Sequence, residues 1–286
     1  SIPSIVREVS RMTMMPEFRG IIQDIGGPTA NMYGMSCPGW ETRGTCADQN
    51  CSPECPNLAC SYDPQITLLK TLRQIPGVKR VFVSSGIRYD LIGPEEAGYL
   101  EELCARHVSG HLKVAPEHIS PHITELMGKP SREAFDSFRI CFEKLQAGKK
   151  KRQYLVPYFM SGHPGCTVPD MIELAEYIRD TRHYTEQVQD FTPTPMTVST
   201  CMYHTGVNPL TMEPVHVPKD REKRIQRAIL QYRDEANREL VLEGLRKAGR
   251  TDLIGSGEKC LIRASYKDHK KRTRKAVEKK GNSPQP

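Results

Sequence analysis

Residues 20–60 read GIIQDIGGPTANMYGMSCPGWETRGTCADQNCSPECPNLAC and join an apolar strand, a glycine turn and five cysteines. The first six residues have the short apolar character of a buried parallel strand, and Gly26-Gly27-Pro28 ends that strand. A strand that ends in a glycine turn lets the backbone come close to a ligand. We therefore expect residues 20–25 to form a strand whose carboxyl end, at the glycine turn, faces a ligand.

Five cysteines follow this glycine turn: Cys37, Cys46, Cys51, Cys55 and Cys60. Their spacing allows several thiolates to converge on one metal ion or iron–sulfur cluster. The alternative is a surface loop, rich in Pro and Gly, that carries unrelated thiols. Because the loop holds half of the chain's ten cysteines, a metal site is the preferred interpretation.

Outside this stretch, helical apolar patterns alternate with short apolar strands. The predicted helices are residues 4–14, 63–76, 94–107, 131–145 and 167–179, and the later strands are 80–84, 111–115, 153–160 and 187–191. Such alternation is typical of a parallel sheet covered by helices. The sequence therefore predicts an α/β fold, either an open doubly wound sheet or an arc of a barrel.

The pattern changes after Thr192. Five prolines predict an extended segment up to residue 218, and helices are expected at 219–232 and 234–247. The predicted domains are an α/β domain over 1–215 with a cysteine-rich insert at 34–62, a helical region at 216–264, and a disordered basic tail at 265–286.

The net charge of +7 is concentrated in that tail. Residues 267–280 hold eight Lys or Arg against two acidic residues, a net +6, which leaves +1 for the rest. The tail is therefore a candidate for binding nucleic acid and is expected to be dispensable for folding. No apolar run approaches the roughly 18 residues of a membrane span, and the N-terminus is neither a signal peptide nor a start methionine. We expect a cytoplasmic protein, without a membrane partner, that lacks its beginning.

Polar segments follow every predicted strand, where parallel α/β proteins bind their ligands. They are Gly26-Gly27-Pro28, SSGIRYD at 84–90, PEH at 116–118, SGHPG at 161–165 and TPTPMT at 192–197. Together they suit a polar cofactor with amine, carboxylate and ribose groups. Each has a simpler alternative: a solvated turn at 116–118, a local ion pair between Arg88 and Asp90, and a turn-shaping role for His163. No P-loop or GxGxxG fingerprint is present, which disfavours nucleoside-triphosphate and Rossmann sites.

These motifs resemble the YgiQ-type family of radical S-adenosylmethionine (SAM) proteins. The matching segments are SIVRE at 4–8, DIGGPTANMY at 24–33, SGIRYD at 85–90, KVAPEH at 113–118, SGHPG at 161–165 and MYHTG at 202–206, and the likeness runs to about Ala264. The resemblance implies a partial (βα)6 barrel that lacks its first βα unit and carries a C-terminal helical appendage. It also implies reductive cleavage of SAM at a [4Fe–4S] cluster, an unidentified substrate, and a reductant such as flavodoxin or ferredoxin.

The resemblance also implies roles for particular residues. The implied SAM contacts are Gly26 and Gly27 at the methionyl amine, Ser85 with Lys113 or Glu117 at the ribose and carboxylate, and Gly162, Pro164 and Gly165 at the adenine. Cys37, Cys46, Cys51 and Cys55 match the family's cysteine insert, where zinc or an auxiliary iron–sulfur cluster is expected. The family's CxxxCxxC triad is absent from this sequence, so the ligands of the [4Fe–4S] cluster are expected upstream of Ser1. We therefore interpret the chain as a fragment that is inactive alone, from a protein that is an enzyme when intact.

Two other functions remain open. In the first, a four-cysteine zinc site stabilises a binding module whose basic tail holds nucleic acid or an acidic protein. Its discriminator is colour, because zinc is colourless and iron–sulfur clusters are brown. In the second, a metal-dependent barrel hydrolase uses His111, Glu117, His118 and His163, but several His–carboxylate clusters would be expected and one is present.

Overall fold

The computed structural model describes residues 1–27, 29–44, 46, 51–52, 55–93, 96–184 and 188–263. The chain divides into two compact units, Ser1–Phe159 and Met160–Pro286. Among the residues described, no helix combines the length and apolar character needed to cross a membrane. The predicted basic tail, with Ala264, lies outside the described residues.

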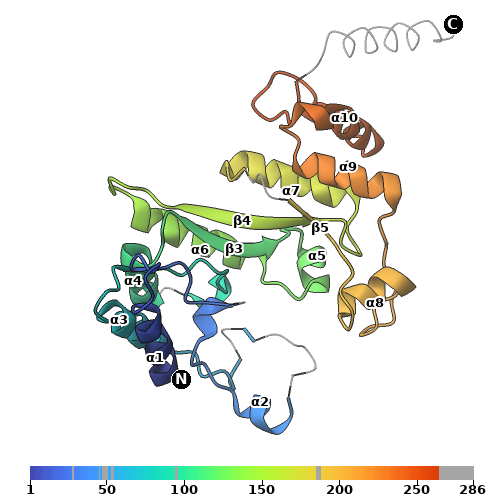
Figure 1. The fold of residues 1–286 in the computed structure, drawn as a ribbon. Helices are drawn as coiled ribbons and strands as arrows, with labels where there is room; N and C mark the ends of the chain where they lie inside the picture. The colour runs from blue at the N-terminus through green and yellow to red at the C-terminus, as the bar shows by residue number, and fades with distance from the viewer. Residues whose placement is uncertain are drawn as a thin grey trace, which may run out of the picture. The chain divides into compact units, whose positions relative to one another are not determined.

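Helices alternate with short strands along most of the chain (Figure 1). The α-helices are α1 (Ile2–Met12), α2 (Pro38–Thr42), α3 (Asp63–Arg73), α4 (Ala97–Arg106), α5 (Pro121–Leu126), α6 (Arg132–Gln146), α7 (Val168–Thr181), α8 (Val198–Thr205), α9 (Asp220–Leu230) and α10 (Arg238–Lys247). The strands are β1 (Ile21–Ile22), β2 (Arg80–Val81), β3 (His111–Glu117), β4 (Tyr154–Ser161) and β5 (Val188–Asp190).

Parallel pairing joins the strands of the first unit in chain order. β1 pairs with β2, with Ile21 opposite Arg80, and Ile21 remains 42% exposed. A parallel bridge between Ile87 and Val114 leads from the segment after β2 to β3, and β3 pairs in parallel with β4. The predicted α/β fold with parallel strands is confirmed, and the partial barrel remains a prediction.

The core of the first unit forms where the apolar stripes of its helices were expected. The fully buried side chains include Leu69 and Leu72 of α3, Leu100 and Leu103 of α4, and Phe135, Phe138 and Phe142 of α6. Tyr89, in the 3₁₀ helix η2 (Tyr89–Leu91), packs edge-on against Phe135 with ring centroids 5.3 Å apart. This contact fixes the backbone that follows β2, which is one of the predicted ligand-facing segments.

In the second unit, α9 lies beside both α7 and α10 (Figure 1). α7 begins with the predicted capping box of Thr167 and Asp170. Gly244 of α10 lies so close to α9 that an added Cβ would meet Ile225 Cγ2 at 2.7 Å. These helices therefore form a close-packed layer around the buried side chains of Ile229 and Leu245.

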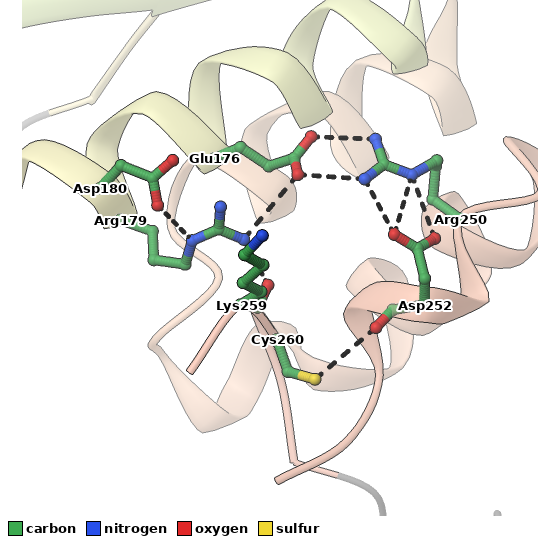
Figure 2. A network of polar contacts seen from close by, with 7 residues as sticks. All are labelled: Glu176, Arg179, Asp180, Arg250, Asp252, Lys259 and Cys260. Atoms are coloured by element: carbon green, nitrogen blue, oxygen red, sulfur yellow. Dashed lines mark hydrogen bonds and ion pairs between the residues drawn. The ribbon is translucent and has the colours of Figure 1, made fainter. Parts of the chain in front are cut away.

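A network of charges ties the segment after α10 to α7 (Figure 2). The Arg250 guanidinium donates to Glu176 at 2.9 and 3.0 Å and also to Asp252. Arg179 of α7 donates to Asp180 and to the backbone carbonyl of Lys259. The loop up to residue 263 is thereby held to the helix layer by paired charges as well as by apolar contacts.

The structure corrects the predicted elements at several places. The strand expected at 20–25 contains two residues; after it, the Asp24 side chain accepts from the Ser84 N–H and the Ile25 N–H still donates to the Phe82 carbonyl. The segment predicted to be extended after Thr192 contains α8, whose N-cap Thr197 accepts from the Thr200 N–H at 3.2 Å. The short helices α2 and α5 were also missed, since neither is long enough to show a helical period.

Candidate functional site

Asp24 joins the carboxyl ends of β1 and β2 in the first unit. Its carboxylate accepts from the backbone N–H of Ser84 at 2.9 Å, from that of Ser85 at 3.2 Å, and from the Ser85 hydroxyl. Partial burial acts to raise the pKa of Asp24, but these hydrogen bonds outweigh it and hold the pKa below its usual value. The nearby Lys113 ammonium also lowers the pKa of Asp24. Ser85 and Lys113, both predicted site residues, therefore lie near one carboxylate.

The two glycines after β1 have different surroundings. At Gly26 an added Cβ would lie 2.9 Å from Asp24 Oδ1 and from Ser85 Oγ, so no side chain fits without displacement. At Gly27 an added Cβ would meet no atom of the described residues within 4 Å. Both glycines line a cavity of about 330 Å³ with Ile5, Thr29 and other side chains. The backbone at Gly27 is therefore open to a ligand, as the glycine turn predicts.

Glu117 is strained and incompletely paired at the end of β3. Its φ of 64° places a non-glycine residue in the left-handed region, at a register shift between β3 and β4. Its side chain is 15% exposed, with Oε1 3.4 Å from Lys129 Nζ, and Oε2 has no hydrogen-bond partner among the described residues. Burial raises the pKa of Glu117, although the Lys129 ammonium opposes that rise. This carboxylate thus presents an acceptor that a ligand donor could satisfy.

The histidines of the hydrolase alternative do not form one site. His111 begins β3 and Glu117 ends it, so six residue steps of extended chain separate the two. His118 is buried, and its Nδ1 accepts from the Ser120 N–H at 3.0 Å, which shapes the turn into α5. In the part of the chain that the structure describes, no three His, Cys, Asp or Glu side chains are grouped to hold a metal. The proposed hydrolase site is therefore not formed.

The turn 162–166 follows β4 in the second unit and is held on several sides. The N–H of Gly162 donates to Gln226 Oε1 at 3.0 Å, and the N–H of Gly165 donates to the His216 carbonyl at 2.6 Å. Gly162 and Gly165 have φ values of 74° and 93°, which side chains other than glycine rarely adopt. The glycines of the SGHPG motif are therefore required by the turn itself, and Pro164 lies between them.

His163 lies inside this turn as a neutral side chain. Its Nδ1 is 2.7 Å from the Pro164 carbonyl, which can only accept, so Nδ1 carries the hydrogen and the Ser199 hydroxyl donates to Nε2 at 2.8 Å. Burial lowers the pKa of His163 to about 4, against the opposing effect of the Pro164 hydrogen bond. The turn-shaping interpretation of His163 therefore accounts for its contacts.

Arg88 forms the predicted local ion pair and a second contact that the sequence did not reveal. Its Nε and Nη2 donate to the two carboxylate oxygens of Asp90 at 2.8 and 2.5 Å. Nη2 also donates to the Cys51 carbonyl at 2.6 Å. Asn31 fixes the Arg88 backbone by accepting from its N–H at 2.7 Å. Arg88 therefore anchors the cysteine-rich insert to the segment after β2.

The cysteine-rich insert is described only in part. Cys37 is buried, Cys51 and Cys55 are half-buried, and Cys46 is exposed. Several residues between them lie outside the described ranges, and no metal-binding group is found among those inside. The four-cysteine centre therefore remains a prediction.

Sequence reasoning also missed Gln226 and Lys129, which contact predicted site residues from distant positions. Gln226 lies on a helix expected only to pack, and Lys129 follows α5. A Gln on the buried face of α9, between Ile225 and Ile229, was a signal that the sequence did contain.

The chain was also compared with known protein families and with curated proteins. Residues 186–286 match the family described as "Domain of unknown function (DUF3362)". The chain is 53% identical over 273 residues to a "UPF0313 protein" from Methanosarcina mazei, covering 94% of this chain and 44% of that protein. "UPF0313 protein CPE1196" from Clostridium perfringens is 48% identical over 264 residues, covering 91% of this chain and 40% of that protein. A "UPF0313 protein" from Methanocella arvoryzae is 53% identical over 263 residues, covering 91% of this chain and 44% of that protein. The chain is thus strongly similar to UPF0313 proteins over nearly its whole length, and it spans less than half of each of these relatives.

Proposed function

We propose that this chain is the SAM-binding portion of a radical SAM iron–sulfur enzyme with an unidentified substrate. The observation that carries the proposal is Glu117, which ends a parallel strand with a strained backbone and a buried oxygen, Oε2, that has no hydrogen-bond partner among the residues the structure describes. Strain and unpaired buried polar atoms cluster at ligand sites. The family resemblance and the strong similarity to UPF0313 proteins support the same assignment.

The residues of the first unit have chemistry that fits SAM. The ribose hydroxyls and methionyl amine are hydrogen-bond donors, and Glu117 Oε2 is an available acceptor. The open backbone at Gly27 allows a close approach, and the Lys113 ammonium can pair with a carboxylate. The family resemblance is the basis for proposing the glycine turn of the second unit, which includes Gly162 and Gly165, as the adenine contact, and the hydrogen bond from the Gly162 N–H to Gln226 supports an ordered turn there.

A bound [4Fe–4S] cluster would supply the electron for reductive cleavage of SAM. Its CxxxCxxC ligands do not occur in this sequence, so the proposed tasks of these residues are to bind and orient SAM and to exclude water. A longer protein that joins this region to a CxxxCxxC motif should release 5′-deoxyadenosine when it is incubated anaerobically with SAM and a strong reductant. Failure to do so would contradict the proposed chemistry.

Binding of SAM to the chain itself tests the site. We expect Glu117→Gln to weaken SAM binding by roughly tenfold or more in isothermal titration calorimetry, since a hydrogen bond to a charged group is lost. Glu125→Gln, on the exposed surface of α5, is the matched control and should bind as the parent does. Equal affinities for the parent and Glu117→Gln, or no binding by the parent, would overturn the assignment.

A further inference from the structure

Gln226 is a buried polar side chain in the middle of α9. It is 0% exposed, although it lies in a helix whose other buried side chains, such as Ile225 and Ile229, are apolar. A primary amide buried among apolar groups is costly unless its hydrogen bonds are made. Its presence therefore calls for specific partners.

Those partners are the two ends of the turn 162–166. Gln226 Oε1 accepts from the Gly162 N–H at 3.0 Å, and Nε2 donates to the Cys166 carbonyl at 2.9 Å. Nε2 also lies 3.2 Å from Glu222 Oε1, one turn earlier in α9. One side chain therefore spans the turn and fixes the distance between its ends.

A second contact from the same region reinforces this arrangement. The Gly165 N–H donates to the His216 carbonyl at 2.6 Å, and His216 Nε2 lies 3.0 Å from Glu222 Oε1. Gln226, Glu222 and His216 thus form a connected chain of hydrogen bonds. All three lie in the segment that matches DUF3362.

The turn needs this support because its own conformation is unfavourable for an unconstrained chain. Its two glycines have φ values of 74° and 93°, and glycine loses more backbone freedom on ordering than any other residue. An added Cβ at Gly162 would lie 3.0 Å from Lys223 Cε, so α9 also covers the turn sterically. Without contacts from α9, the turn would sample other conformations before it bound a ligand.

We propose that Gln226 is a positioning residue for the adenine of SAM, holding the turn 162–166 in its binding conformation from the DUF3362 segment. This inference rests on the proposed function. A turn ordered in advance loses less conformational entropy when the ligand binds, so the bracing contributes to affinity without touching the ligand. The DUF3362 segment is then part of the cofactor site and not a separate appendage.

The test combines ligand affinity with local dynamics in the full chain. S-adenosylhomocysteine is the probe, because it carries the adenosine and needs no reduced cluster. Gln226→Leu keeps most of the side-chain volume and removes both hydrogen bonds to the turn. We expect it to weaken binding about tenfold and to speed amide hydrogen exchange at 162–166 selectively. Ile229→Val is the control, since it loosens the buried face of α9 without contacting the turn, and its affinity should stay within about twofold of the parent.

A second variant guards against a failure of Gln226→Leu to fold. Gln226→Met fills nearly the same space with an unbranched side chain and also removes both hydrogen bonds to the turn, so a loss of about tenfold is again expected. Parental affinity in both variants, or the same loss in Ile229→Val, would overturn the positioning role and leave the proposed function intact. If the parent itself does not bind the probe while Gln226→Leu still speeds exchange at the turn, the proposed function fails and Gln226 only stabilises the turn.

Discussion

The turn after β4 and the end of β3 differ in whether their buried polar groups have hydrogen-bond partners. In the turn, the N–H groups of Gly162 and Gly165 and both nitrogens of His163 have protein partners. At the end of β3, Glu117 keeps a buried carboxylate oxygen without a partner among the described residues. The hydrogen bonds that order the turn thus come from the protein itself. At the end of β3, by contrast, a ligand donor could bind that Glu117 oxygen.

The two regions are therefore expected to contribute differently to folding and to ligand binding. A satisfied polar network contributes to the folded state and resists substitution. An unsatisfied buried carboxylate costs stability and is retained when it serves binding. Substitutions in the turn should therefore affect folding strongly, and substitution of Glu117 should affect ligand binding while leaving folding nearly unchanged.

The largest expected effect is the pH dependence produced by His163. Because burial lowers its pKa to about 4, the unfolded chain binds a proton between about pH 6.5 and 4 that the folded chain does not. Stability is therefore full above pH 6.5 and falls by about 3 kcal/mol as the pH drops to 4. Urea unfolding at several pH values should show this loss in the parent and a shallower slope in His163→Asn. Parallel slopes would show that His163 does not stay neutral in the turn.

Gly26 and Gly27 offer a matched pair at the end of β1. An alanine at 26 would push against Asp24 and Ser85, whereas one at 27 meets open space. We expect Gly26→Ala to lower the free energy of unfolding by about 2 kcal/mol and Gly27→Ala to change it little. Gly27→Ala should instead weaken SAM binding, because its methyl group enters the space left for a ligand. Equal melting temperatures for the two variants would contradict the difference in packing.

Asp24→Asn should have a smaller effect, because Asp24 is exposed. The variant loses the charge that strengthens the hydrogen bonds from Ser84 and Ser85, so a loss of about 1 kcal/mol is expected at pH 7. The lowered pKa of Asp24 means that its contribution is present above its unfolded pKa and is lost as the pH falls through the folded value. The parent and the variant should therefore converge in acid, and a constant gap down to low pH would argue against this role.

Glu117→Gln should produce the smallest change in stability, below about 1 kcal/mol at pH 7. Burial raises the pKa of Glu117, so the protonated parent is the more stable form and stability is lost as the pH rises through the folded pKa. Any gain from the neutral glutamine should therefore be seen at pH 7 and vanish in acid. Thermal unfolding at both pH values measures this, and a large loss of stability at pH 7 would mean that the carboxylate is structural.

Much of the architecture could be predicted from local patterns. The apolar stripe of α6 and the capping box of α7 are properties of neighbouring residues, and the structure confirms both. The hydrogen bond from the Ser84 N–H to the Asp24 carboxylate could not be predicted, because it joins residues 60 positions apart in the sequence. The brace from Gln226 to Gly162 spans 64 positions and is likewise invisible to a periodic pattern. The sequence thus shows which side chains can bind ligands or form hydrogen bonds, and the fold determines which of them come into contact.

The outer edge of β1 has a consequence for how the protein behaves in concentrated solution. β1 pairs with β2 on one side, and within the described ranges no strand covers its other side, where Ile21 is 42% exposed. An open parallel edge with an apolar side chain is a template for a strand from another molecule. Self-association through this edge would rise with protein concentration and fall when Ile21 is replaced by lysine. Light scattering of the parent and of Ile21→Lys over a concentration series would test this. Association that falls in the variant indicates edge pairing, and equal association in both indicates general insolubility.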